Sequence, residues 1–400
     1  MQNKKRISYF CHQQNIYPKK IEKIMKRIIT LIVAAAAAAC SSPKLYVALD
    51  NPTVIDRHGE TVEIAWSDIT SKIGDAAPES IIVLDDEAQQ IPSQIICLGS
   101  DEPQSLIFQA DVEPLSNRVY SITKGQREEY TSYVYGRQVP ERYDDYAWEN
   151  DRAAYRLYGP ALETSPEKLI TPGIDIWVKR SDKLVINDRY ERADYHHDNG
   201  DGLDCYKVGV TLGGGGCVPF VDGELCMMTH NYVTCRTLDN GPLRTTVELT
   251  YAPFTAGDAE VTLTKVISLD KGRWFNRMDN VYTGEFESLP IAAGFVRHDV
   301  KEMRPGDGCF AFVEAASDSQ NPAEDGDIYG AIVLPDAQIL PEAQGHALAV
   351  KEVAPGQTLT YYAGSGWSKG GIADMDEWED ITVEQLAAAI APLQVKLLMK

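Results

Sequence analysis

The amino-acid sequence predicts an all-β protein, a large antiparallel β-sandwich with one short C-terminal helix. Short runs of β-branched and aromatic residues recur along the chain and are separated by Asp, Pro, Ser and Gly. The chain also contains 20 Tyr and 6 Trp, whose flat rings suit pleated sheets. With 44% hydrophobic and 24% charged residues among 400, the composition is that of a globular protein with a substantial core.

The first residues have the pattern of an export signal. A basic start at residues 25–27 is followed by an apolar run at 28–33, an alanine run at 34–39, and Cys40. This pattern is too short for a spanning helix and is typical of a bacterial lipoprotein signal. We therefore expect Cys40 to carry a lipid anchor on a membrane, in the periplasm or at the outer membrane. Met25 makes a better start than Met1.

Charge excludes one class of partner. The whole chain has a formal net charge of −21. Residues 1–39, the expected upstream extension and signal peptide, hold eight Lys/Arg and one Glu, so the remainder has 30 basic and 58 acidic side chains and a net charge of −28. Such a surface repels phosphate backbones, so we expect no nucleic-acid partner. An acidic ligand would need a local cluster of basic groups.

Residues 40–135 are expected to form an N-terminal β portion. Its β-type runs are bounded by turn residues and lie at 44–49, 61–66, 80–84, 91–98, 105–108 and 118–122. The sequence becomes irregular and charged around 130–141, which indicates a seam, although one continuous domain remains an alternative.

Residues 136–400 are expected to form the larger sandwich. Its runs lie at 154–158, 174–178, 216–220, 225–228, 231–238, 244–251, 260–269, 274–282, 291–296, 310–313, 329–334, 347–353, 358–363 and 395–399. The turn residues 270–272 predict a hairpin between two of them. One helix is expected, with Thr382 as its N-cap, Gln385 in the reciprocal capping position, and Pro392 beyond its end.

The densest group of chemically active residues is the stretch 195–207, which continues to four glycines at 213–216. It holds two His, three Asp, two Tyr and a Lys in a Gly-punctuated loop. Loops on a rigid β scaffold commonly carry binding and catalytic groups. We expect this stretch to line the functional cleft.

Six cysteines follow residue 40, and four of them lie between 205 and 235. An exported chain permits disulfides, and a Cys217–Cys226 pair between neighbouring strands is one alternative. Burial as free thiols is the other. No Cys-x-x-Cys spacing occurs, so a zinc ribbon is not indicated.

Several motifs resemble those of the DUF4861 family. They are Asp144-Asp145-x-Ala147-Trp148-Glu149-Asn150-Asp151-Arg152 with Tyr158-Gly159-Pro160, then Tyr195-His196-x-Asp198-x-Gly200-x-Gly202-Leu203-Asp204-x-Tyr206-Lys207, then Asn231-Tyr232 and Gly241-Pro242-Leu243-Arg244. The resemblance implies an exported protein of polysaccharide-utilisation systems in Bacteroidetes. It also implies a β-supersandwich related to galactose-mutarotase-like proteins and polysaccharide lyases, and elimination or dehydration of oligosaccharides that contain uronic acids. This chain has His196-His197 where the motif usually carries one His.

Elimination across C4 and C5 of a uronic acid needs a base, an acid and a partner for the carboxylate. His and Tyr suit proton transfer, and Arg or Asn suits the carboxylate. We expect His196, Tyr232 and His298 to be catalytic. The expected substrate-binding residues are Arg152, Asp198, Asp204, Asn231, Arg236, Arg244, Trp367 and Lys369.

No cofactor motif is evident, since the glycines at 213–216 are not followed by the Lys-Ser/Thr of a phosphate loop. A divalent metal remains an alternative, with His196 and Asp198 as its ligands. The leading function is a lyase or dehydratase acting on acidic oligosaccharides or polysaccharides. The alternatives are a non-catalytic glycan-binding lipoprotein and a mutarotase-like or glycoside-hydrolase activity, the last requiring two carboxylates across a cleft.

Overall fold

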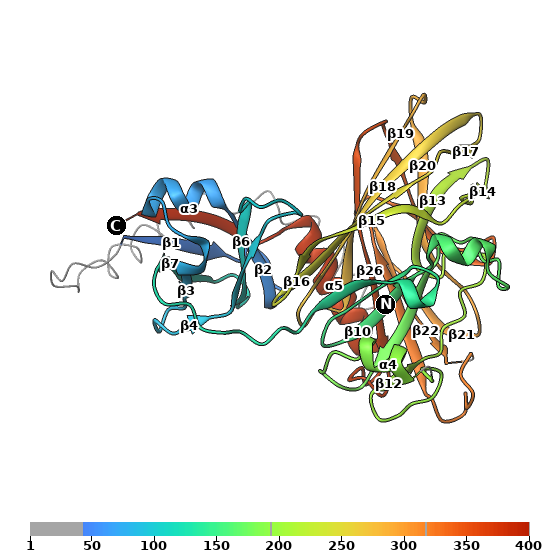
Figure 1. Ribbon diagram of the computed structural model, residues 1–400, viewed down its shortest axis with the longest axis horizontal. Coiled ribbons are helices and arrows are strands. Elements are labelled where there is room, and N and C mark those ends of the chain that lie inside the picture. The colour runs from blue at the N-terminus through green and yellow to red at the C-terminus, as the bar shows by residue number, and fades with distance from the viewer. Residues whose placement is uncertain (1–42, 193, 317, 400) are drawn as a thin grey trace. The chain divides into compact units, whose positions relative to one another are not determined.

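Antiparallel strands dominate the computed structural model, which describes residues 43–192, 194–316 and 318–399. The residues from 44 onward form one unit. Cys40 and the expected signal peptide lie outside the described residues. The predicted all-β antiparallel fold is confirmed (Figure 1). Within the described ranges, no helix has the length and apolar character needed to cross a membrane.

The N-terminal portion contains two small sheets with a helix and a 3₁₀ turn. Its elements are β1 (Lys44–Asp50), β2 (Arg57–Ala65), α3 (Trp66–Ile73), η2 (Pro78–Ser80), β3 (Ile81–Leu84), β4 (Gln90–Ile91), β5 (Ser93–Ile96), β6 (Ser105–Val112) and β7 (Asn117–Lys124). The sheet order is β2-β6-β5 in one sheet and β1-β7-β3-β4 in the other. Leu45, Val47 and Leu49 alternate inward from β1 into a core of their own.

The last described strand, β27 (Gln394–Met399), completes the sheet that contains β1. It pairs antiparallel with β1, in a register that joins Leu45 to Met399 and Asp50 to Gln394. The run expected at 395–399 is therefore a strand. It adds to the N-terminal portion rather than to the large sandwich, as the red and blue strands in Figure 1 show.

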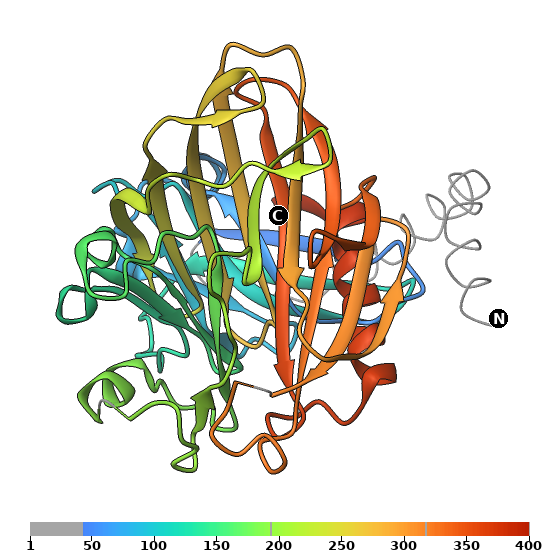
Figure 2. The same cartoon turned by 90° about the vertical axis from the view of Figure 1, so that its right-hand side faces the viewer.

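The large portion is a sandwich of one broad sheet and two smaller ones. The broad sheet has the order β15 (Tyr232–Asn240), β16 (Arg244–Tyr251), β18 (Ala259–Asp270), β19 (Phe275–Gly284), β26 (Thr358–Trp367), β23 (Asp327–Val333), β22 (Cys309–Ala315) and β21 (Val300–Pro305), with β17 (Phe254–Ala256) beside β18. Its strands run side by side in yellow, orange and red in Figure 2. The predicted hairpin around 270–272 is confirmed by the pairing of β18 with β19.

Each smaller sheet has five strands. One has the order β14 (Glu224–Leu225), β13 (Gly214–Val221), β20 (Leu289–Val296), β25 (His346–Val353) and β24 (Gln338–Ala343). The other, which we call the site sheet, has the order β12 (Gly202–Asp204), β11 (Ile174–Lys179), β10 (Ala153–Leu157), β9 (Asp145–Glu149) and β8 (Tyr135–Val139). The 3₁₀ turns η3 (Pro140–Arg142) and η4 (Pro160–Thr164) flank the site sheet.

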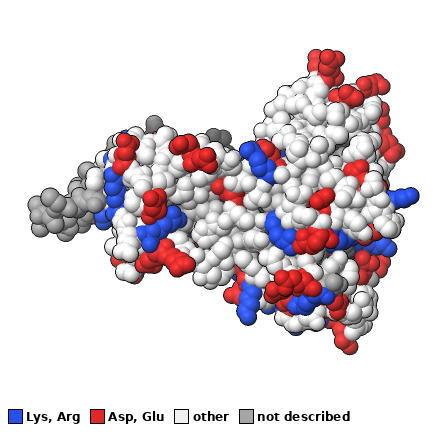
Figure 3. Space-filling model, viewed as in Figure 1, with Lys and Arg blue, Asp and Glu red and all other residues white. Residues whose placement is uncertain are grey.

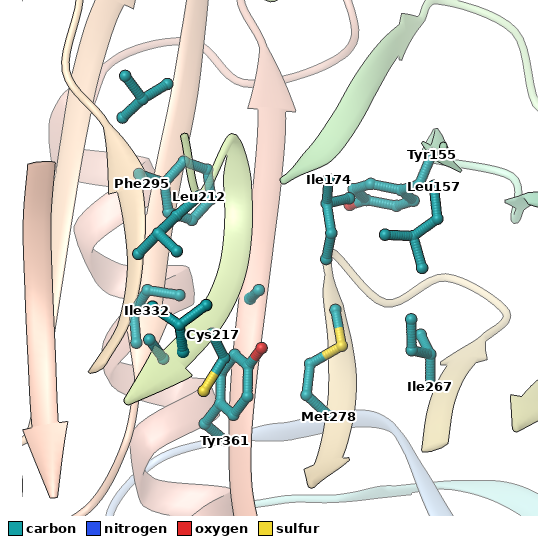
Figure 4. Close-up of a cluster of buried hydrophobic side chains, with 14 of the residues drawn as sticks. Tyr155, Leu157, Ile174, Leu212, Cys217, Ile267, Met278, Phe295, Ile332 and Tyr361 are labelled. Atoms are coloured by element: carbon teal, nitrogen blue, oxygen red, sulfur yellow. The ribbon is translucent and has the colours of Figure 1, made fainter. Parts of the chain in front are cut away.

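The main core lies between these sheets. In β18 every second residue from Val261 to Leu269 is buried, as expected for a strand with one face inward. Met278 of β19, Tyr155 of β10 and Cys217 of β13 belong to the same buried cluster, so all three sheets contribute to it (Figure 4). The six cysteines in the described ranges are free thiols, so the structure does not contain the Cys217–Cys226 disulfide.

Three α-helices pack on the sheets of the described part. α5 (Met375–Ile390) covers β22 and β23, and its Trp378 ring stacks on Phe275 at 5.8 Å. Its N-cap is Asp374 rather than Thr382, which lies inside the helix and donates its hydroxyl to the Trp378 carbonyl. The predicted helix start was therefore wrong. The sequence reading also missed α3 and α4 (Ile186–Arg192), which are short.

Candidate functional site

The stretch expected to hold the site folds over the outer face of the site sheet. Trp177 on β11 points to this face, away from the main core. Tyr190 of α4 lies 5.1 Å from the Trp177 ring, and Tyr195 stacks on that ring at 4.9 Å. These aromatic contacts fix α4 and the following loop as a cover on the sheet.

Buried charges hold α4 in place. The Glu149 carboxylate accepts hydrogen bonds from the backbone amides of Val185 and Ile186, both at 2.8 Å, at the start of the helix. It also forms an ion pair of 2.7 Å with Lys179, and both side chains are fully buried. Arg189 donates to the carbonyls of Val178 and Asp201. The motif residue Glu149 thus has a structural role, because it holds helix α4 on the site sheet.

Three carboxylates surround one guanidinium beneath this cover. The Arg156 Nη2 atom lies 2.5 Å from the Asp175 carboxylate and 3.2 Å from that of Asp204, and Arg156 Nε lies 3.9 Å from Asp145. The strand register places these residues together, because Arg156 is opposite Asp175 and Asp204 is opposite Trp177. All four side chains are nearly fully buried.

The cluster retains protons more strongly than free carboxyl groups do. Burial raises the pKa of Asp145 to about 6, although Arg156 opposes the shift. Burial also raises the pKa of Asp175 and of Asp204, and the charge of Asp175 raises that of Asp204 further. One guanidinium cannot balance three buried negative charges, so the cluster can hold a proton near neutral pH.

A cavity of about 400 Å³ opens beside the cluster. Its walls come from the site sheet, η3, the cover and the segment after β12. The lining residues are Arg142, Arg156, Tyr158, Glu167, Leu169, Asp175, Tyr195, His196, Asp204, Tyr206, Lys207, Val208, Gly209 and Asp318. Basic and acidic side chains gather together over α4 and β12 on the surface in Figure 3.

His196 is the one histidine among these lining residues. Its Nδ1 atom lies 3.3 Å from the Asp204 carbonyl oxygen and 3.8 Å from the Asp204 carboxylate. The side chain is 52% exposed, and its Nε2 atom has no hydrogen-bond partner among the described residues. An imidazole whose Nδ1 faces an acceptor keeps the lone pair on Nε2, so His196 can take a proton from a molecule in the cavity.

The cations Arg142 and Lys207 and the phenols Tyr158 and Tyr195 also line the cavity. Arg142 lies 3.0 Å from the Glu167 carboxylate, and Lys207 forms no ion pair within the described part of the chain. The Tyr195 ring lies against both His196 and Arg156. Burial raises the pKa of Tyr158 well above its ordinary value, so this phenol stays protonated. The cavity can therefore present a base, phenolic proton donors and positive charge to one ligand.

Two residues expected at the site lie elsewhere. The Tyr232 hydroxyl is turned to the Asp144 carbonyl. Asn231 donates to the carbonyls of Gly159 and Leu169, both at 3.0 Å, and accepts from the Thr171 amide. These bonds fix the chain segments beside the cavity, and neither residue lines it.

His298 also lies outside the cavity lining, next to it. Its Nδ1 atom lies 2.7 Å from the buried Glu314 carboxylate, and its Nε2 atom lies 2.9 Å from the Lys207 carbonyl. Burial opposes protonation, but the hydrogen bond and charge of Glu314 outweigh it and raise the pKa of His298. With both nitrogens engaged, His298 is placed to position Lys207 rather than to exchange a proton with a ligand.

The remaining substrate-binding candidates are distributed over the molecule. Arg236 on the edge strand β15 pairs with Glu248 on β16, and Arg244 pairs with Asp270 and Glu63. Trp367 is buried and donates to the Asp325 carbonyl, with Lys369 beside its ring. Arg152 lines a second, smaller cavity.

Asp198 stabilises the loop in which it lies. Its carboxylate accepts the amides of Gly200 and Gly202 and pairs with Arg180. Within the described ranges, no group of three or more His, Cys, Asp and Glu side chains is arranged to hold a metal ion.

Sequence reasoning missed the charged floor of the cavity. Asp175 stands in the apolar run Ile174–Val178, and Arg156 stands in the strand before Tyr158. A charged residue inside a strand that is buried on both faces must have a partner. That signal could have indicated Asp175 and Arg156, but it could not have shown that they meet.

Fold and site together define an antiparallel β-sandwich protein with a polar cavity on the outer face of a small sheet. A family model described as "Domain of unknown function (DUF4861)" matches residues 49–395. The chain therefore belongs to the DUF4861 family. It is 29% identical over 411 residues to "Uncharacterized protein P7" of Formosa agariphila, covering 93% of this chain and 100% of that protein.

Two solved structures show the fold in other proteins. A protein in the Glycosyl Hydrolase Family 38 from Enterococcus faecalis matches 90% of this chain with a TM-score of 0.51 and 9% identity. An alpha-mannosidase from Enterococcus faecalis V583 matches 94% with a TM-score of 0.53 and 9% identity. This chain covers 48% of each of them, so it spans about half their length. The likeness is one of fold.

Proposed function

We propose that this protein is a carbohydrate-active enzyme that eliminates across C4 and C5 of uronic acids in oligosaccharides, as a lyase or dehydratase. The observation that carries the proposal is the placement of His196. Its Nδ1 faces Asp204, its Nε2 is available, and Arg142 and Lys207 line the same cavity. The two cations suit the carboxylate that makes the C5 proton acidic.

In this reaction His196 Nε2 takes the C5 proton, and the electrons of the C5–H bond form the C4–C5 double bond. The C4–O bond breaks, and its electrons leave with the oxygen. Tyr195 supplies the proton that this oxygen needs. The imidazolium then releases its proton to solvent, and solvent returns a proton to the phenolate. The Asp204 backbone carbonyl, 3.3 Å from Nδ1, holds the imidazole in the orientation that the first step requires and accepts a hydrogen bond from the imidazolium.

The test is the ultraviolet absorbance of the unsaturated uronate, followed while the purified protein is incubated with uronic-acid oligosaccharides. We expect the absorbance to rise, and His196→Gln to slow the rise by about 10²–10⁴-fold, the usual contribution of a general base. His197→Gln is the matched control, because His197 is exposed, contacts Asp194 and does not line the cavity.

Other outcomes of this experiment would support one of the alternative functions. Saccharide binding of equal affinity in wild type and His196→Gln, without absorbance change, would support a non-catalytic glycan-binding protein. New reducing ends without absorbance would support a hydrolase. The geometry argues against hydrolysis by Asp175 and Asp204. These two residues lie on adjacent strands and bind the same nitrogen of Arg156, so they do not face each other across the cavity.

We also propose that the protein is exported and anchored by lipid at Cys40, with an acidic glycan as its ligand and no nucleic acid as partner. The basis is the basic, apolar and small-residue order of residues 25–40, together with the acidic charge of the chain. Radiolabelled palmitate incorporation, lost in Cys40→Ala, is the expected result.

A further inference from the structure

A second site candidate is built from motif residues that the elimination does not use. Asn150 fixes the turn before β10 with four hydrogen bonds. Its amide donates to the carbonyls of Asp270 and Arg273, both at 2.7 Å, and its oxygen accepts from the amides of Arg152 and Ala153. The neighbouring Asp151 accepts the Gly272 amide at 2.6 Å. This turn is rigid, and the side chain that it presents is Arg152.

Arg152 lies at a cavity of about 190 Å³ between the β18–β19 turn, α5 and the start of β2. The lining residues are His58, Arg152, Gly272, Arg273, Trp274, Phe275, Ile381 and Glu384. The guanidinium of Arg152 stacks over the half-buried Trp274 ring at 5.1 Å. Stacking holds the guanidinium plane while its edge remains able to donate two parallel hydrogen bonds.

The positive charge of Arg152 is not neutralised by the other charged residues that line this cavity. Arg273 donates to the His58 carbonyl at 3.0 Å and to Gln385 at 3.1 Å, and it lies 3.7 Å from Glu384. The one carboxylate of the lining is thus paired with Arg273. Arg152 has no ion-pair partner among the residues that the structure describes. In a chain with a net charge of −21, Arg152 is thus an exposed cation that can receive an anion.

We propose that this cavity is a second saccharide subsite, which binds one acidic sugar through Arg152 and Trp274. A planar fork beside an aromatic surface matches a carboxylate or sulfate group carried on a sugar ring. The volume is below that of ordinary ligand pockets, which fits a single ring rather than an oligosaccharide. The assignment rests on the proposed function for the class of ligand, and it requires no catalysis.

The experiment titrates the ¹⁵N-labelled protein with glucuronate, a sulfated monosaccharide or neutral glucose, and follows the indole N–H resonance of Trp274. That resonance is identified by its loss in Trp274→Phe. The buried Trp148, Trp367 and Trp378 donate their indole N–H groups to protein oxygens, so they provide internal references. We expect a saturable shift of the Trp274 resonance with an acidic sugar and none with glucose.

Arg152→Gln should weaken this binding about tenfold or more, because it removes a charge-assisted hydrogen bond. Arg236→Gln, at an exposed arginine outside both cavities, should leave it unchanged. A Trp274 resonance that ignores acidic sugars, or shifts equally in Arg152→Gln, would overturn the proposal. The elimination assay can fail while the Trp274 shift is observed, and the shift can be absent while elimination is observed. The two proposals are therefore tested separately.

Discussion

A lysine lies inside the main core and forms no ion pair with any described residue. Lys265 occupies one of the inward positions of β18, is fully buried, and its ammonium has no hydrogen-bond partner among the described residues. The ammonium lies 5.6 Å from the centre of the Tyr251 ring. Opposite it on β19, the buried amide of Asn280 likewise lacks a partner within the described part. Burial lowers the pKa of Lys265 to about 8.

This pKa predicts how stability depends on pH. Below about pH 8 the folded protein must bury the charge. Between about 8 and 10.5 the folded state has lost the proton while the unfolded state keeps it, so the free energy of unfolding rises with pH. The full cost at neutral pH is about 3 kcal/mol. Lys265→Met should therefore stabilise the protein at pH 7, as measured by urea unfolding.

The advantage of Lys265→Met should shrink as the pH rises from 8 toward 10. Lys183→Met, at an exposed lysine, is the control and should change the free energy of unfolding little at either pH. A stability difference between Lys265→Met and wild type that stays constant over this interval would contradict the assignment.

At the scale of single residues, the sequence predicted the loop side of the site better than its floor. His196 and Asp204 were expected from their density of active groups, and both line the cavity. Arg156 and Asp175 were missed because they meet only through the register of β10 with β11. Register depends on which strands become neighbours, and one sequence does not show this.

Among the elements, helix α5 is the clearest case of a local signal interpreted at the wrong position. The Asp374 carboxylate accepts the amides of Asp376 and Glu377, both at 3.0 Å, and Glu377 accepts the Ala373 amide. This arrangement resembles a capping box, except that Glu377 accepts the amide of the residue before the N-cap. The Thr382 and Gln385 pair has the same spacing, but both side chains lie within the helix and are buried.

Asp374→Ala should lower the free energy of unfolding by about 1 kcal/mol, because two amides in the first turn lose their acceptor. The measurement is urea unfolding at neutral pH. Asp380→Ala, at an exposed position inside the same helix, is the control and should cost clearly less. Equal losses in the two variants would show that Asp374 does not act as the cap.

The one predicted hairpin is confirmed, whereas the two short helices were not predicted. The β18–β19 hairpin is encoded locally by Asp270-Lys271-Gly272 between alternating strands. Helix α3 buries only Ile69 and Ile73, and α4 is fixed by the distant carboxylate of Glu149. Helices of two turns depend on tertiary contacts, so local periodicity gives little warning of them.

On the scale of the whole molecule, strand β27 ties the two ends of the described chain together. Leu393 and Leu397 pack against the N-terminal core, and Arg57 donates to the Ala391 carbonyl at 2.9 Å. Removal of residues 394–400 should therefore destabilise the N-terminal portion by about 2–4 kcal/mol, since β1 loses a partner and the core loses a leucine.

Hydrogen exchange of the β1 amides, followed by mass spectrometry, is the measurement. Exchange should accelerate at residues 44–50 in the truncated protein. Leu398→Ser is the control, because that side chain is 37% exposed and the backbone pairing with Tyr46 is retained. Unchanged protection of β1 after truncation would contradict the prediction.

The pairing of β1 with β27 also sets the order in which the protein can fold. Leu45 precedes its partner Met399 by 354 positions, and the other strands of the described part lie between them in the sequence. The sheet that contains β1 therefore stays incomplete until β27 has been made, and this contact has a very large sequence separation. Because contacts of such long range form slowly, we expect β1 and β27 to pair late in folding, after the hairpins of the large sandwich.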